Sequence, residues 1–492
     1  MSQSHKESGI SGAKWNGLFN FTKYLITFAL SIILARLLEP ADFGLIGMIS
    51  ILTGIAAIFI DSGFSISIIQ MKNLNTEDFS SIFFFNIIVS FSFYIIIFFL
   101  APFIADFYDE PQLTSLTRII TLVFVINSFG NVQSALLFRN LNFKKRAVIN
   151  LSGIGISAII ASIMAFKGFG IYSIVGQVIS QAFVTNSLYW LRSKWRPKNW
   201  IKKNSFTKTW NFSSKLLLTD IIGTTVDNID NILIGKVFSA SQLGYYVRAR
   251  SSKMIFEDIF SMMLSATALS VLSKVSDNIS EFRRLHLHFF KLGIYAFFPV
   301  VFGTIATAEA FTVSLFSDKW LPAVPLLQIL ALTSITRFIS SLFYQTMLSA
   351  GNSSLYFKLK TTEKILRFLS VPFGLYVGLY AFVWANVIIG FGFLVVSFIY
   401  IGKVSKVSCR EYLSLLFKPL ILSVLTGLIT YSLVFLPVEN SFVMLFSQVT
   451  VGIATYILLS LIFKVKEYYY IKDVVFEQLS QYKKRFFKHK KD

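Results

Sequence analysis

The chain has 492 residues, of which 54% are hydrophobic and only 14% are charged. Soluble domains carry about 25% charged residues, so this composition excludes an ordinary soluble domain and indicates many membrane-spanning segments. The formal net charge is +21, but most of the excess lies in connections and near the C-terminal end, where it predicts membrane topology rather than a nucleic-acid partner. The single cysteine, Cys409, excludes an intramolecular disulfide.

Hydropathy predicts fourteen transmembrane helices and an all-α polytopic fold. Each predicted helix holds the roughly 20 residues needed to cross about 30 Å of hydrocarbon, and the longer ones are expected to tilt or kink. The segment before the first span has no short apolar core with a cleavage site, so we expect it to be uncleaved. The predicted spans are 14–38, 42–70, 79–104, 113–138, 147–166, 169–191, 210–238, 242–272, 286–316, 323–349, 356–378, 379–401, 412–436 and 441–463.

Basic and acidic residues alternate between successive connections. The segments 139–146 and 192–208 are rich in Lys and Arg, whereas the intervening connections hold acidic residues such as Asp106 and Asp109. Because Lys and Arg near helix ends are retained on the cytoplasmic side, this alternation predicts a multi-pass membrane protein with both termini in the cytoplasm. The basic tail is also expected to contact anionic lipid headgroups.

The sequence contains an internal repeat. A shift of 200 residues aligns Gly44 with Gly244, and a shift near 209 aligns Asp109 with Asp318. Six spans return the chain to its starting side, so the halves would be parallel repeats about an axis along the membrane normal; the alternative is chance similarity between apolar segments. The predicted organisation is an N-terminal six-helix lobe at 1–191, a basic linker at 192–209, a C-terminal six-helix lobe at 210–401, two additional helices at 402–465 and a basic tail at 466–492.

Several predicted spans carry polar residues at helical spacing, which is typical of helices that line a shared cavity. A charge this deep in the bilayer costs about 2.5–3.5 kcal/mol and tends to face a bundle interior or water. Tyr344 is the one aromatic residue on such a polar face that could stack on a sugar. We expect substrate contacts from Lys23, Arg250, Lys253, Arg337, Asn20 and Tyr344.

Acidic residues in the predicted spans are candidates for binding a coupling proton or Na⁺. These candidates are Asp61, Asp220, Asp227, Glu257 and Glu309. The alternative for Asp227, Asp230, Arg250 and Glu257 is structural pairing between helices. Stripes of Ser, Thr and Asn also form interhelical hydrogen bonds. Arg248 lies near a helix end, where we expect its side chain to reach the lipid headgroups.

Motifs of common enzymes are absent from the sequence. It contains no Walker loop for ATP, no HExxH, no CxxC and no GxSxG. His286 and His288 stand where a cytoplasmic loop enters a span and are too isolated to predict a metal site. We therefore expect neither an enzyme nor a bound cofactor or metal.

The sequence resembles the bacterial polysaccharide transporters in several segments. These are Gly12-Ala13-Lys14-Trp15, the stretch from Leu34 to Gly44, the stretch from Asp61 to Gln70, the stretch from Asp230 to Lys236, and Phe316 to Pro322. The resemblance is to the Wzx-type flippases of the multidrug/oligosaccharidyl-lipid/polysaccharide superfamily, in the branch of colanic-acid and teichuronic-acid exporters. It implies two pseudo-symmetric six-helix lobes, two further helices and a MATE-like architecture.

The resemblance also implies a function. A flippase of this family would move undecaprenyl-diphosphate-linked oligosaccharide units of O-antigen, lipopolysaccharide, capsule or exopolysaccharide to the outer leaflet by alternating access, possible partners being a polysaccharide polymerase and a chain-length regulator. A diphosphate-sugar headgroup cannot cross hydrocarbon, so basic side chains would have to replace its hydration. The alternatives are a multidrug or small-solute antiporter, a lipid II flippase, a membrane polysaccharide polymerase or glycosyltransferase, and a structural scaffold.

Overall fold

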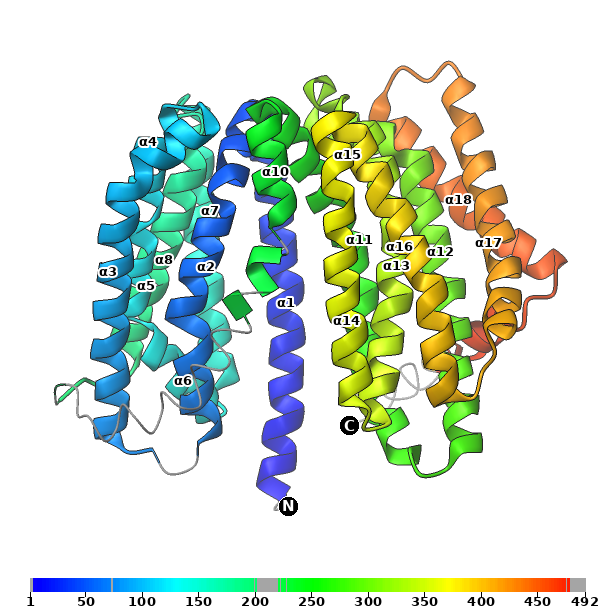
Figure 1. Cartoon of the computed structure of the whole chain (residues 1–492), viewed down its shortest axis with the longest axis horizontal. Coiled ribbons are helices and arrows are strands. Elements are labelled where there is room, and N and C mark those ends of the chain that lie inside the picture. The colour runs from blue at the N-terminus through cyan, green and yellow to red at the C-terminus, as the bar shows by residue number, and fades with distance from the viewer. Residues whose placement is uncertain are drawn as a thin grey trace, which may run out of the picture. The chain divides into compact units, whose positions relative to one another are not determined.

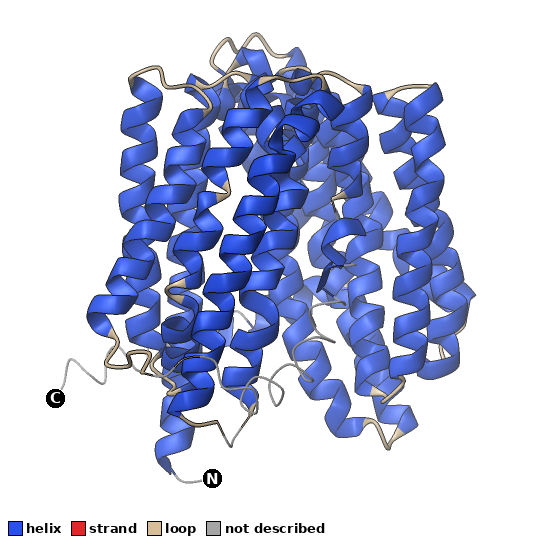
Figure 2. Cartoon of the chain, turned by 60° about the vertical axis from the view of Figure 1, so that its left-hand side comes forward, coloured by secondary structure: helices blue, strands red, loops and turns tan. Residues whose placement is uncertain are grey.

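The computed structural model describes residues 3–71, 74–198, 200, 220–221, 223–226, 228–474 and 476–477. Within these ranges the chain is almost entirely helical and contains no β-strand, as Figure 2 shows. The chain packs as two compact units, Met1–Val247 and Arg248–Asp492 (Figure 1). The boundary between the predicted lobes, 192–209, stays a prediction, because most of that linker lies outside the described residues.

The first unit is a bundle of helices that run back and forth across it. Two of its helix starts show why they form where they do: α2 begins with a proline, which fits the first helical turn, and α3 begins after Asn75. Asn75 Oδ1 accepts a hydrogen bond from the Asp78 amide at 2.9 Å, and Asp78 Oδ2 accepts one from the Asn75 amide. The helices are α1 (Gln3–Leu37), α2 (Pro40–Gln70), α3 (Thr76–Tyr108), α4 (Gln112–Ile120), α5 (Leu122–Ser128), α6 (Asn131–Arg139), α7 (Phe143–Phe166), α8 (Tyr172–Arg192), α10 (Ile229–Val237) and the start of α11 (Ala240–Leu272).

The predicted fourth span, 113–138, is not one straight helix. The structure divides it into α4, α5 and α6, and the chain bends by 45° between Gln112–Ser128 and Asn131–Arg139. Gly130 stands at the bend, where a Cβ atom would lie 1.6 Å from Asn186 Oδ1. The break therefore lets α8 approach the backbone closely, which apolar periodicity alone does not predict.

Corresponding segments of the predicted repeat, in α2 and at the start of α11, contact each other inside the first unit. A Cβ atom at Gly44 would lie 1.8 Å from the carbonyl oxygen of Ala240, and one at Gly244 would lie 1.8 Å from the carbonyl oxygen of Pro40. The two contacts are equivalent to each other, because the same shift of 200 residues relates Gly44 to Gly244 and Pro40 to Ala240. The backbones of α2 and α11 cross at van der Waals distance, which only glycine permits here.

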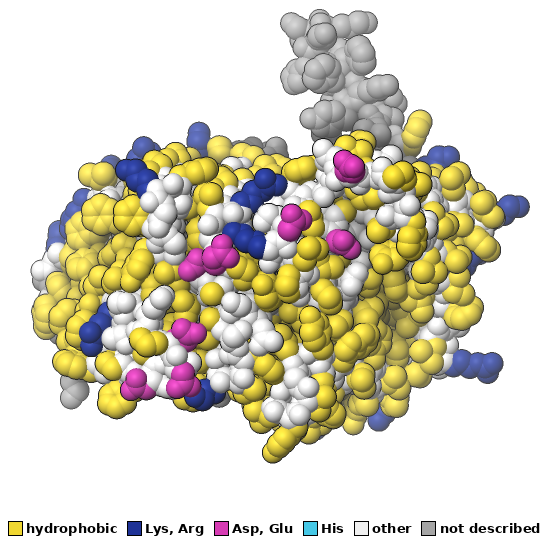
Figure 3. Space-filling view, turned by 90° about the horizontal axis from the view of Figure 1, so that it is seen from above, with side chains coloured by type: hydrophobic (Ala, Val, Ile, Leu, Met, Phe, Trp, Pro, Cys, Tyr) yellow, Lys and Arg dark blue, Asp and Glu magenta, His cyan; other side chains and the backbone are white. Residues whose placement is uncertain are grey.

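Charged residues of the first unit separate between its two ends. Asp106, Asp109 and Glu110 lie where α3 meets α4, whereas Arg139 and Lys144 lie at the opposite end, beside the turn from α6 to α7. Figure 3 looks onto the upper end of Figure 1 and shows Asp and Glu side chains gathered on that face. The arrangement matches the alternation of charge along the sequence.

The second unit continues α11 and adds the remaining helices. Gly378 has φ 124° and separates α15 from α16, where the sequence predicts the break between the eleventh and twelfth spans. The elements are η1 (Ser273–Val275), α12 (Ile279–Phe316), η2 (Asp318–Trp320), α13 (Ala323–Ser349), α14 (Ser353–Arg367), η3 (Phe368–Ser370), α15 (Val371–Tyr376), α16 (Leu379–Ser405), α17 (Cys409–Ser432), η4 (Leu433–Phe435) and α18 (Ser441–Ile462).

An aromatic core around His286 joins three helices of the second unit. His286 Nδ1 lies 3.0 Å from Thr346 Oγ1 on α13, and His286 Nε2 lies 2.6 Å from the Tyr412 hydroxyl on α17. Thr346 donates its own proton to the carbonyl of Leu342, so His286 Nδ1 donates to Thr346. His286 is therefore a buried structural residue, and it ties α17 to the preceding helices.

Eight helices in the described part of the chain are long and apolar enough to cross a membrane, and α4–α6 form a further bent candidate. These helices establish an all-α polytopic membrane protein. Each of the fourteen predicted spans overlaps helical residues of the structure, but the predicted seventh span is described only in part. The number fourteen therefore stays a prediction.

Candidate functional site

A polar cavity opens in the first unit between α1, α7 and α8. Its volume is about 380 Å³, within the range typical of ligand sites. Asn20 and Lys23, both predicted from the polar stripe of the first span, lie on its α1 side. The complete lining is Phe19, Asn20, Lys23, Phe143, Arg146, Ala147, Asn150, Ile154 and Gln181.

The lining of this cavity is basic. Lys23 and Arg146 supply two cations, and three amide side chains complete its polar surface. None of the described residues that line it is an Asp or a Glu. Lys23 is exposed, and within the described part of the chain its ammonium group makes no ion pair. The cavity is therefore suited to an anionic ligand.

Hydrogen bonds beside the cavity connect two of its lining residues. Arg146 Nε donates to Ser134 Oγ at 3.3 Å, and the Arg146 guanidinium lies 5.2 Å from the centre of the Phe138 ring. Ser134 Oγ donates to the Tyr189 hydroxyl, and Tyr189 donates to Asn150 Oδ1, each at 3.2 Å. The chain of donors therefore begins and ends at the cavity and runs through α6 and α8.

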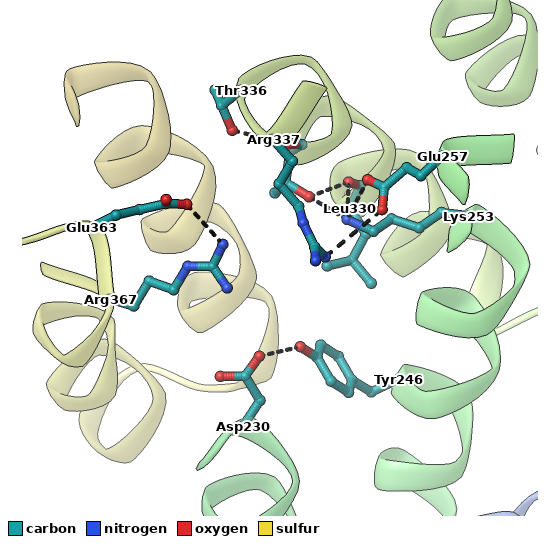
Figure 4. A network of polar contacts seen from close by, with 10 residues as sticks. Asp230, Tyr246, Lys253, Glu257, Leu330, Thr336, Arg337, Glu363 and Arg367 are labelled. Atoms are coloured by element: carbon teal, nitrogen blue, oxygen red, sulfur yellow. Dashed lines mark hydrogen bonds and ion pairs between the residues drawn. The ribbon is translucent and has the colours of Figure 1, made fainter. Parts of the chain in front are cut away.

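The second unit holds a cluster of charges of a different kind, shown in Figure 4. Lys253 Nζ lies 3.1 Å from Glu257 Oε1 and 2.6 Å from Thr333 Oγ1. Arg337 approaches the other oxygen of Glu257 at 3.7 Å. The Lys253 side chain is 4% exposed and that of Arg337 is 42% exposed. One carboxylate thus separates a buried cation from a cation that reaches the surface.

A second ion pair of this unit lies on α14. Arg367 and Glu363 are 3.2 Å apart, and the Tyr344 hydroxyl donates to the other oxygen of Glu363 at 2.5 Å. The Tyr344 ring packs edge-on against Tyr356, with 5.5 Å between ring centres. Tyr344 is thus held by protein groups in this conformation, and its proposed role in stacking on a sugar stays a prediction.

The other predicted residues are scattered over the structure. Arg250 is half-buried on α11, Asp220 is half-buried, and Glu309 is exposed on α12. Asp61 lies on α2, but its side chain is outside the described part of the structure, and Asp227 lies outside the described residues altogether.

Arg248 does not reach toward headgroups as we expected. It is buried, with its guanidinium 3.7 Å from the centre of the Phe316 ring and 5.4 Å from that of Trp320. Facing aromatic rings stabilise a desolvated guanidinium by cation–π attraction, and these rings come from a distant part of the sequence. The prediction of a lipid-facing Arg248 is therefore wrong.

Sequence reasoning missed Arg146, Asn150 and Gln181 in the cavity. The basic segment 139–146, which the sequence predicts as a cytoplasmic connection, contains Arg146, but α7 begins at Phe143 and includes this residue. The spacing of Arg146 and Asn150 by four residues was an available signal, because it places both on one helix face. Among the described residues, no group of His, Cys, Asp and Glu could hold a metal ion.

Comparison with known proteins gives consistent results. Residues 33–325 match the family model described as polysaccharide biosynthesis protein. The chain is 27% identical to the teichuronic acid biosynthesis protein TuaB of Bacillus subtilis over 86% of this chain and 88% of that protein. It is 24% identical to the lipopolysaccharide biosynthesis protein WzxC of Escherichia coli, with 87% and 88% covered.

A solved structure shares the fold. The lipid II flippase MurJ in an inward closed conformation superposes with a TM-score of 0.73 at 16% identity, over 91% of this chain and 98% of that chain. At this identity the match establishes a common fold of membrane helices and nothing about the ligand.

Proposed function

Because the chain belongs to the polysaccharide biosynthesis protein family, we propose that it is a flippase for lipid-linked oligosaccharides. Its substrate would be a repeat unit on undecaprenyl diphosphate, moved from the cytoplasmic to the outer leaflet of the bacterial cytoplasmic membrane by alternating access. The observation that carries the proposal is the cavity of the first unit, which brings Lys23, Arg146 and three amides together inside a bundle of membrane helices.

The chemistry of such a substrate explains why basic groups are needed. A diphosphate and its sugars lose their hydration on entering a bilayer, and an unpaired buried charge is very costly. Arg offers a planar pair of donors to phosphate oxygens, whereas Lys offers a compact charge. Lys23 in the first unit and Arg337 in the second are each exposed enough to meet such a ligand.

The relatives favour this substrate class over the alternatives. TuaB and WzxC are named for the biosynthesis of teichuronic acid and lipopolysaccharide, and both match along most of their length. An antiporter of cationic drugs would favour acidic groups in its cavity, and the described cavity offers none. A lipid II flippase remains the nearest alternative, because MurJ shares the fold. A polymerase would need chemical groups for which the sequence has no motif.

Several finer features belong to the same proposal. Both termini would lie in the cytoplasm, on the side where the basic connections gather. Transport would be coupled to a proton or a cation, with Asp61, Asp220, Asp227, Glu257 and Glu309 as candidates. A polysaccharide polymerase and a chain-length regulator would act on the product, and the protein itself would catalyse no covalent step.

Reconstitution tests the proposed function directly. Proteoliposomes would contain the purified chain and an undecaprenyl-diphosphate oligosaccharide, and an impermeant glycosidase would score the sugars that become exposed. We expect faster exposure than in protein-free vesicles, with or without a pH gradient according to the coupling. Parallel vesicles with lipid II separate the nearest alternative: transport of lipid II alone would overturn the proposal in favour of that function.

A further inference from the structure

The cavity of the first unit has a fixed hydrogen-bonding polarity, which points to the chemical class of its ligand. We infer that it is an oxyanion site, in which Lys23, Arg146 and Asn150 donate to the oxygens of a phosphate or a carboxylate. The inference rests on the proposed function for its biological meaning, but its chemistry follows from the orientation of the side chains. It goes further than a generally basic lining, because it states which atoms of the neutral Asn150 amide face the ligand.

The orientation of Asn150 follows from the hydrogen bonds beside the cavity. Each hydroxyl group has one proton to donate. Ser134 donates it to the Tyr189 hydroxyl, and Tyr189 donates its own to Asn150 Oδ1. With its oxygen turned toward Tyr189, Asn150 is left to present the Nδ2 donors to the cavity. Within the described part of the chain, Nδ2 donates to no protein acceptor.

Arg146 is the first donor of this chain of hydrogen bonds, which ends at Asn150. Its Nε donates to Ser134 Oγ at 3.3 Å, and an arginine cannot act as an acceptor. Ser134 therefore accepts from Arg146, and its own proton goes to the Tyr189 hydroxyl. The hydrogen bonds thus connect two residues of α7 through Ser134 and Tyr189, and Tyr189 is the positioning residue that holds the Asn150 amide.

The resulting surface suits an acceptor and opposes a cation. Lys23 and Arg146 have only donors, and Asn150 is held as a donor. Among the described lining residues there is no carboxylate that could bind Na⁺ or a proton. Asn20 and Gln181, whose amides can turn either way, can meet hydroxyl groups beside the anion. Two sources carry this chemistry in a lipid-linked oligosaccharide: the diphosphate bridge and the carboxylate of an acidic sugar.

The sharpest variant is Asn150→Asp, which keeps the shape of the side chain and replaces its donors by acceptors. Binding of inorganic pyrophosphate, of glucuronate and of neutral glucose would be measured by calorimetry on the full-length protein in detergent, at constant ionic strength. We expect the wild type to bind at least one of the two anions more tightly than glucose. Asn150→Asp should weaken that binding by at least about tenfold, because a lost charged hydrogen bond is joined by repulsion.

Matched variants separate this site from general electrostatics. Asn142→Asp adds the same charge at the start of α7 but outside the cavity, and Lys144→Gln removes a nearby exposed cation that does not line it. Both should bind the anion as the wild type does, whereas Lys23→Gln and Arg146→Gln should bind about tenfold more weakly. Equal effects of Asn142→Asp and Asn150→Asp would overturn the inference.

Tyr189→Phe tests the positioning role, because it frees the Asn150 amide to rotate. We expect the preference for the anion over glucose to fall by several-fold at an unchanged melting temperature. An unchanged preference would remove Tyr189 from the inference.

Each binding result has one meaning. Tighter binding of pyrophosphate assigns the site to the diphosphate bridge, tighter binding of glucuronate assigns it to an acidic sugar, and equal binding assigns it to oxyanions in general. Binding of neither anion, or binding of glucose alone, overturns the inference. The assay involves no transport, so a protein that binds anions in this way but moves no lipid-linked oligosaccharide would lose the proposed function and keep the site.

Discussion

The cavity of the first unit and the charge cluster of the second hold positive charge in opposite ways. In the first unit, Lys23 and Arg146 line a cavity of about 380 Å³ that contains no described carboxylate. In the second, Lys253 and Arg337 are both bound to the same carboxylate, Glu257. A cation without an internal counter-ion is available to a ligand at once, whereas a paired cation must first exchange its carboxylate for the anion of the ligand.

The difference shows that burial and function are separate properties of these residues. Lys253 is almost fully buried, so its charge is tolerated only because Glu257 neutralises it. Lys23 is exposed and needs no partner to be stable. Substitutions at the buried Lys253–Glu257 pair should therefore act first on stability, and substitutions at Lys23 should act on ligand binding and transport.

Glu257→Gln should give the largest effect on stability. It leaves the Lys253 ammonium group buried without its carboxylate, and breaking a buried pair in this way costs about 3–5 kcal/mol. We expect a clear fall in the melting temperature of the purified protein in detergent, while Lys23→Gln should melt as the wild type does. Replacing both partners, in Lys253→Met/Glu257→Leu, should restore most of the loss. A wild-type melting curve for Glu257→Gln would show that the pair does not stabilise the second unit.

Lys23→Gln and Arg146→Gln should give the largest effect on transport without a change in folding. Each removes a charged donor from the cavity, and a charged hydrogen bond contributes about 1.5–3 kcal/mol. The rate in the proteoliposome assay should fall by about tenfold or more. Lys144→Gln, two residues from Arg146 and outside the cavity, is the matched control. Equal rates for all three variants would place the substrate elsewhere.

Arg337 should fall between these extremes. Its side chain is 42% exposed and 3.7 Å from Glu257, so Arg337→Gln should cost only about 1 kcal/mol of stability. Transport should fall by several-fold, and Arg337→Lys should recover part of it, because the charge is kept and the planar fork is lost. Full recovery by lysine would mean that only the charge of Arg337 matters.

The exposed pair of Arg283 with Glu411 should show the smallest effect. The atoms are 2.8 Å apart, but the side chains are 44% and 32% exposed. Such pairs contribute about 0–1 kcal/mol and are screened by salt. Arg283→Gln should therefore transport at the wild-type rate and lose at most a small, salt-dependent part of its stability. A large loss would show that α12 and α17 depend on this contact.

Much of the fold could be predicted from the sequence, because the bilayer imposes one length and one polarity on every span. The break at Gly378 and the ends of α7, α13 and α18 lie within a few residues of their predicted positions. The bend at Gly130 could not be predicted in this way, since it depends on Asn186 of another helix.

The candidate site could be predicted only in part, for a similar reason. The stripe of α1 identified Asn20 and Lys23, because one helix face can be counted along the sequence. The spacing of Lys253 and Glu257 also allowed them to meet, but the approach of Arg337 depends on how α13 packs against α11. The orientation of the Asn150 amide depends on Ser134 and Tyr189, which lie on two other helices. The local sequence around Asn150 therefore could not predict it.

The crossing of α2 and α11 has the contact pattern of a symmetric dimer. Gly44 and Gly244 occupy equivalent positions of the repeat. Gly44 lies against Ala240, and Gly244 lies against Pro40, which is the position equivalent to Ala240. A reciprocal pair of contacts, in which position i meets position j and j meets i, is what a two-fold homodimer makes. If a half-length ancestor formed such a homodimer, a single glycine position would have supplied both close contacts. Gene fusion would then have separated the two copies, leaving each free to diverge everywhere except where the backbones touch.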